Sequence, residues 1–140
     1  MNIQEVIDRL KSECPLLKSR VAGAADYDLA LEQNTFLTPC AYVVELSNKA
    51  DSNQVMNGVA QTITVQIGVM VIISNQRDGT GKAAHDDLQP TRLEIMTALC
   101  GWKPSAADIP IEYLAGRSEG SFDLNRFWAD VFTTDYLFLN

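Results

Sequence analysis

The stretch Val59–Ser74, VAQTITVQIGVMVIIS, decides how this chain folds. Apolar residues recur with a period of two, which is typical of a β-strand with one buried face. That face carries Val59, Ile63, Val65, Ile67, Val69, Val71 and Ile73. The opposite face is polar early, with Thr62, Thr64 and Gln66, and apolar later. At ~3.4 Å per residue the strand spans ~50 Å. We therefore expect it to bend at Gly68 or to project from the body as a β-ribbon.

A second strand is predicted just upstream, over Thr38 to Leu46, because Cys40, Tyr42, Val44 and Leu46 alternate on one face. The intervening segment Ser47 to Gly58, SNKADSNQVMNG, is polar and ends in Asn-Gly. That composition predicts a flexible loop between two strands of a long hairpin.

Two segments have the spacing of amphipathic helices. The first carries Ile3, Val6, Ile7, Leu10, Cys14 and Leu17, with Asn2 as a predicted N-cap, Glu5 in the capping-box position and Pro15 at the end. The second carries Ala84, Leu88, Ile95, Met96, Leu99 and Trp102, with Pro90 in its first turn or at a kink and Gly101 as its C′ residue. The segment Ala24 to Leu31 is compatible with either a short helix or an extended connection.

Ile109 to Ala115 and Arg126 to Leu139 are predicted to be the last two strands. The latter is apolar on both faces, which is typical of a central strand or of a strand covered by a helix and a partner subunit. The order of elements predicts one α+β domain over residues 1–140. Its sheet is mostly antiparallel and includes the long β-hairpin, and its two main helices pack on one face.

The charge balance narrows the classes of function. The chain has 140 residues, with 11 Lys and Arg against 18 Asp and Glu, which gives a net charge of −7. A generic nucleic-acid binder needs a basic face, so that class is disfavoured. Cys14, Cys40 and Cys100 form no C-x-x-C pair and are expected to be buried free thiols. We expect neither a secretory signal nor a membrane span, so the expected location is the cytosol or a particle assembled there.

Three short motifs resemble catalytic or ligand sites. Gly116–Gly120, GRSEG, matches G-x-S-x-G, yet the residues after it are patterned as a strand and the single histidine, His85, lies upstream. Gly79–Lys82, GTGK, lacks the first glycine and the hydroxyl residue of a phosphate loop. Adjacent Asp86 and Asp87 fit a helix start better than a metal site with His85. We therefore expect a turn at GRSEG, no catalytic residues, no metal and no cofactor, and the chain is not predicted to be an enzyme.

The order of elements resembles that of the tail terminator, or tail completion, proteins of long-tailed phages and prophages, the minor tail protein U type. The resemblance covers most of the chain. It rests on the first helix, the polar loop Ser47 to Gly58, the long strand Val59 to Ser74 and the closing segment Trp128–Thr134, WADVFTT. Its most specific element is the helix end Leu99–Pro104, LCGWKP.

The resemblance implies a structural virion protein that forms a hexameric ring. The ring would cap the tail tube, end tail polymerisation and offer a joining surface to the head connector, after assembly in the host bacterial cytoplasm. Implied partners are further copies of the chain, the tail tube protein and the head–tail connector protein, with no membrane. DNA would pass through the lumen without specific binding.

Contact residues are expected in the two loops: Asn53, Gln54 and Met56 in the first, and Arg77, Asp78 and Lys82 in the second. Three alternatives stay open at this point. One is a head-completion or neck protein, one is a small serine hydrolase that uses Ser118 with His85, and one is a small-molecule binding module.

Overall fold

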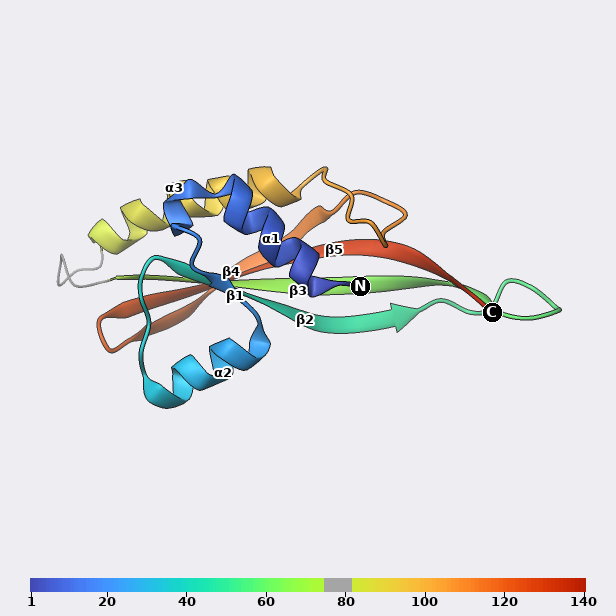
Figure 1. The fold of residues 1–140 in the computed structure, drawn as a ribbon, viewed down its shortest axis with the longest axis horizontal. Helices are drawn as coiled ribbons and strands as arrows, with labels where there is room; N and C mark the ends of the chain where they lie inside the picture. Colours follow the sequence, from blue (N-terminus) through green and yellow to red (C-terminus); the bar gives the residue numbers. More distant parts are fainter. Residues whose placement is uncertain (75–81) are drawn as a thin grey trace.

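A five-stranded sheet runs the length of the molecule in the order β1-β2-β3-β5-β4 (Figure 1). The computed structural model describes residues 1–74 and 82–140, and only the backbone of residues 82–86. The strands are β1 (Val21–Ala22), β2 (Cys40–Ala50), β3 (Ala60–Ser74), β4 (Glu112–Phe122) and β5 (Asn125–Leu139). The helices are α1 (Ile3–Glu13), α2 (Ala24–Gln33) and α3 (Lys82–Leu99), with a 3-10 turn at Pro15–Leu17.

The fold is α+β, as predicted. All strand pairs are antiparallel except β1 with β2. α1 and α3 cover one face of the sheet, as expected for the two main helices, and α2 lies against the other face (Figure 1). The open question over residues 24–31 is thereby settled in favour of a helix. β5 lies between β3 and β4, which confirms it as a central strand.

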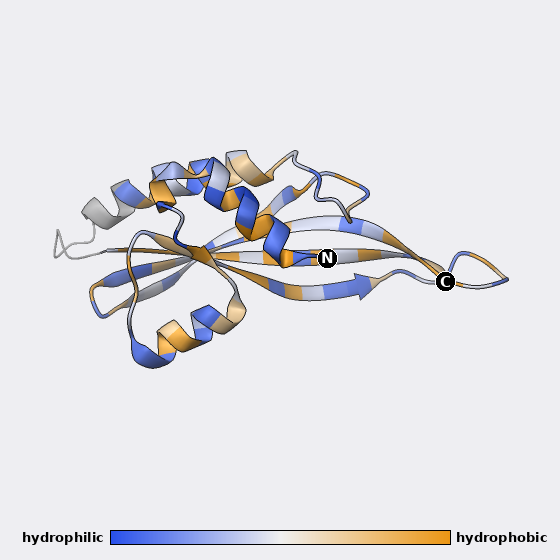
Figure 2. Cartoon of the chain, viewed as in Figure 1, coloured by the Kyte–Doolittle hydropathy of each residue, from blue (hydrophilic) through white to orange (hydrophobic). Residues whose placement is uncertain are grey.

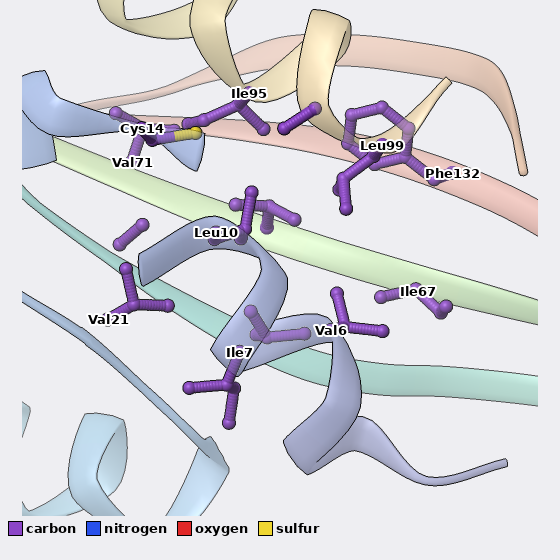
Figure 3. Close-up of a cluster of buried hydrophobic side chains, with 14 of the residues drawn as sticks. Val6, Ile7, Leu10, Cys14, Val21, Ile67, Val71, Ile95, Leu99 and Phe132 are labelled. Atoms are coloured by element: carbon purple, nitrogen blue, oxygen red, sulfur yellow. The ribbon is translucent and has the colours of Figure 1, made fainter. Parts of the chain in front are cut away.

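The main core lies between the sheet and the layer formed by α1 and α3. Val6, Ile7 and Leu10 of α1 point onto the sheet, where the alternating face of β3 meets them (Figure 3). That face is the one predicted from the sequence, and its residues Val65, Ile67, Val69, Val71 and Ile73 are buried. Ile95 and Leu99 of α3 close the core over Phe132.

Helix α1 begins as predicted but its capping differs from the expected box. The Asn2 side chain accepts a hydrogen bond from the Gln4 backbone N–H at 3.0 Å. Glu5 does not complete a capping box; its carboxylate instead accepts bonds from the Ser105 backbone N–H at 2.9 Å and the Ser105 hydroxyl at 2.7 Å. This contact ties α1 to the segment that follows α3, where Gly101 has the expected positive φ of 83°. Pro90 lies inside α3 rather than in its first turn.

Two predicted strand ends are wrong. β2 continues through Ser47 to Ala50, because those residues pair with β3 beyond a bulge at Leu46. β4 continues through GRSEG to Phe122, so that motif lies inside a strand and not at the predicted turn. The turn falls at Asp123 and Leu124, whose φ values are 53° and 67°. Positive φ is uncommon for leucine, which is why the sequence pattern did not indicate a turn there.

The sheet projects past the helices as an arm, which confirms the expected projection of the long strand (Figure 1). We define the arm as residues 47–50 of β2, 60–64 of β3, 135–140 at the end of β5 and the connecting loop 51–59. It contains no buried residue. It has three strands rather than two, because Thr62 of β3 pairs with Leu137 of β5. At its end, Val59 and Asn140 exchange backbone hydrogen bonds of 2.7 and 2.9 Å.

Cys14 and Cys40 are buried free thiols as expected, whereas Cys100 is exposed. Burial raises the pKa of the Cys14 thiol to about 12 and that of the Cys40 thiol to about 11. Such thiols stay protonated and are poor nucleophiles. Within the described part of the chain, the helices are too short or too polar to cross a lipid bilayer.

Candidate assembly surfaces

The loop at the end of the arm is organised by one side chain. Asn53 donates from Nδ2 to the carbonyls of Val55 and Gly58, both at 3.0 Å, and accepts at Oδ1 from the backbone N–H groups of Val55 and Ala60. Gln61 adds a bond from Nε2 to the Asp51 carbonyl at 2.8 Å. The composition, which predicted a flexible loop, gave no indication of this network of hydrogen bonds.

The predicted contact residues of this loop lie together but do different things. Asn53 is turned to the loop backbone, and Gln54 donates from Nε2 to the Ser52 carbonyl. Met56 is fully exposed and Val55 is 45% exposed, so an apolar pair forms the tip of the arm. Exposed apolar residues also line the end of β5, at Leu137, Phe138 and Leu139. Figure 2 shows these apolar positions near the C-terminus and in the loop.

The second group of predicted contact residues is only partly placed. Arg77 and Asp78 lie outside the described residues, as does the GTGK motif up to Gly81. Lys82 is the first residue of α3, and its side chain is outside the described part. In the chain, the first loop precedes β3 and residues 75–81 follow it.

A hollow of about 570 Å³ opens on the sheet face that carries α2. Its floor is formed by small residues on three neighbouring strands: Gly68, Ala129 and Ala115. Val44, Leu46, Met70 and Val131 form its walls, and the rim carries Tyr27 and Asp28 of α2 with Arg117 and Glu119 of β4. The sequence analysis missed this hollow. Its signal is the pair of alanines, Ala115 and Ala129, on neighbouring strands, whereas the Leu46 side chain packs over Gly68, 3.0 Å from where a Cβ there would lie.

A buried polar network joins α3 to β4 and β5. Asp130 is fully buried and accepts two bonds from Arg92, at 3.0 Å from Nε and 2.9 Å from Nη2. It also accepts from Tyr113 Oη at 3.0 Å and Trp128 Nε1 at 2.9 Å. The Arg92 guanidinium stacks 4.3 Å from the Trp128 ring centroid. Hydrogen bonding to Asp130 raises the pKa of Arg92 above its ordinary value, and the arginine is charged at all working pH values.

This network was also missed by the sequence analysis. Its signal is an aspartate on the core-facing side of β5, between Trp128 and Phe132. A carboxylate at such a position must find a cationic partner. Arg92 also donates from Nη2 to Tyr113 Oη at 3.2 Å and from Nη1 to Gln89 Oε1 at 3.3 Å, so the network ties α3 to β4 and β5.

The serine of GRSEG has no catalytic surroundings in the described part of the chain. Ser118 lies in β4 and its hydroxyl accepts bonds from the Gly120 backbone N–H at 3.2 Å and from Arg126 Nη2 at 3.1 Å. A nucleophilic serine needs a strained turn and a histidine in hydrogen-bond reach, and a strand supplies no such turn. Among the described side chains, no three of His, Cys, Asp and Glu come close enough to hold a metal ion.

The described part of the chain thus combines an α+β sheet, an arm with exposed apolar residues and a buried polar network that joins α3 to β4 and β5. The chain belongs to the phage tail terminator protein family, whose model matches residues 1–139. The protein is therefore a structural component of a phage-type tail.

The solved structures agree on the fold. A chain of the structure described as "Virion of native gene transfer agent (GTA) particle" superposes with a TM-score of 0.59 at 16% identity, covering 95% of this chain and 92% of that one. Similarity at this level of identity concerns the fold alone. A comparison with curated protein sequences finds no match.

Proposed function

We propose that the protein forms a closed ring of identical subunits, a hexamer, that caps the tail tube and ends its polymerisation. The other side of the ring would meet the head–tail connector protein, and assembly would take place in the host bacterial cytoplasm. A closed ring suits a terminator because each subunit offers a different surface to each neighbour and closure leaves none of them free.

The observation that carries this proposal is the arm. It projects beyond the helices, contains no buried residue and ends in Val55 and Met56. Together with the exposed Leu137, Phe138 and Leu139 at the end of β5, this tip favours contact with another protein surface. The hydrogen bonds of Asn53 hold the tip in shape before contact, which lowers the entropy cost of binding.

The acidity of the chain fits passage of DNA. A net charge of −7 disfavours a grip on phosphates, which needs lysine and arginine. We therefore propose that the lumen lets DNA slide without specific binding.

The test is assembly with and without the arm tip. Residues Ser52–Gly58 are replaced by Asn-Gly, which shortens the loop but leaves the paired residues of β2 and β3 in place. The variant should keep the far-ultraviolet circular dichroism spectrum of the parent. Native mass spectrometry should show a hexamer for the parent, and electron microscopy should show it at the ends of isolated headless tails; the shortened variant should do neither.

The matched control is Leu93→Asp, since Leu93 is 64% exposed on α3 and lies away from the arm. It should assemble like the parent. Parent protein found only on filled heads would contradict the terminator role and favour a neck protein. Normal tail attachment by the shortened variant would contradict the role of the arm.

A further inference from the structure

The arm tip carries exposed apolar side chains and the hollow has an apolar lining, but the two lie far apart in one chain. The hollow includes Gly68 of β3 in its lining, whereas the tip lies beyond Ala60 of the same strand. Eight residues of strand separate them by ~27 Å. The tip also points along the arm, away from the body of its own subunit (Figure 1). Within one chain, therefore, Met56 does not fill the hollow.

We infer that the tip of one subunit, Val55 and Met56, docks into the hollow of the next subunit. This inference rests on the proposed ring and specifies its contact. The occupant is a second copy of this chain. The contact is heterologous, because the tip and the hollow are different surfaces and each copy uses both.

The distribution of charge favours a second copy as the occupant. Residues 52–74 contain no charged side chain. The residues that form the floor and walls of the hollow are likewise uncharged. Two copies that each carry a charge of −7 repel one another wherever their acidic surfaces meet. The tip and the hollow are surfaces on which the copies can meet without that repulsion.

The chemistry of the two surfaces also matches. Met56 is unbranched and fully exposed, and a methionine adapts to an irregular apolar cavity. Ala115 and Ala129 leave space that such a side chain can enter, and Leu46 is 51% exposed beside it. At the rim, Asp28 and the Arg117–Glu119 ion pair, at 2.7 Å, can remain in water while the apolar floor is covered.

The first experiment is cross-linking between two differently marked subunits. In a Cys100→Ser background, one preparation carries Met56→Cys and the other carries Ala115→Cys. Both positions are exposed, so the fold should persist. A short bis-maleimide should give a covalent dimer in the mixture, little in either preparation alone, and a ladder up to the ring size in the double variant. Leu93→Cys replaces Ala115→Cys as the control and should give no dimer with Met56→Cys.

The second experiment measures self-association by sedimentation. Met56→Asp places a charge on the tip, and Ala115→Trp fills the hollow. Each variant should weaken association at least tenfold, whereas Leu93→Asp should leave it unchanged. If the ring forms without a Met56–Ala115 cross-link and both variants leave it intact, the docking inference is wrong but the proposed ring stands. A parent protein that stays monomeric at every concentration, and with added tail tubes, overturns both.

Discussion

Replacement of Asp130 by alanine should be among the most damaging single changes in this protein. The carboxylate is fully buried and accepts four hydrogen bonds, two of them from Arg92, whose side chain is only 15% exposed. Alanine leaves the guanidinium largely buried without a counter-charge and leaves Tyr113 and Trp128 without an acceptor. Loss of one partner of a buried ion pair costs about 3–5 kcal/mol of unfolding free energy.

Urea denaturation followed by far-ultraviolet circular dichroism measures this loss. With a slope of about 2 kcal/mol per molar urea, the midpoint should fall by roughly 2 M. The matched control is Asp135→Ala on the same strand, which removes a partly exposed carboxylate and should change stability by less than about 0.5 kcal/mol.

A double-mutant cycle separates the ion pair from the cavity. Arg92→Ala with Asp130→Ala should cost less than the sum of the two single changes by about 1–3 kcal/mol, because the second substitution removes the unpaired charge that the first creates. Additive losses, or a loss below about 1 kcal/mol for Asp130→Ala alone, would refute the assignment of a coupled buried pair.

Three further outcomes are expected. Gly116→Ala should destabilise the fold by about 1–3 kcal/mol in a urea titration, since its new methyl group would overlap Tyr113 Oη and Asp130 Oδ1; Gly23→Ala, whose methyl group would sit 3.7 Å from Ile7, is the neutral control. Burial raises the pKa of Cys40 to about 11 and that of Cys14 to about 12, so above the ordinary thiol pKa of 9 the unfolded chain loses protons that the folded chain retains, and stability should fall as the pH rises. Alanine at both positions should flatten this dependence of stability on pH, and an unchanged dependence would contradict the prediction. A thiol reagent should modify Cys100 quickly and Cys14 and Cys40 only after unfolding; fast reaction of all three in native protein would contradict their burial.

The fold followed from the sequence wherever one face of an element was consistently apolar. β3 and α1 were placed to within a residue or two, because their apolar positions keep a strict period of two or of about 3.6. The ends of β2 and β4 were missed because Asn48–Ala50 and Arg117–Gly120 show no apolar alternation. They lie on exposed parts of the sheet, where pairing partners and not burial keep the chain extended. α2 was left open for a related reason: only Ala30 of that helix is buried.

The candidate surfaces were less accessible to sequence reasoning. The tip residues Asn53 and Met56 were selected because they lie in a polar loop, but nothing in the pattern showed that the first organises the loop backbone while the second is fully exposed. The hollow combines residues from α2 and four strands, and the Arg92–Asp130 network combines residues from α3, β4 and β5. Such combinations depend on strand order, and strand order was not predicted.

The pairing of β3 with β5 also sets when the arm can exist. Ala60 pairs with Leu139, and Val59 with Asn140, so the arm joins segments separated by most of the second half of the chain. Contacts of such long range form slowly, because a large loop must close first. On a ribosome, the β2–β3 hairpin emerges long before its third strand, and the tip cannot be held in its final position until β5 has been made. The arm therefore reaches its three-stranded form only after β5 has been synthesised.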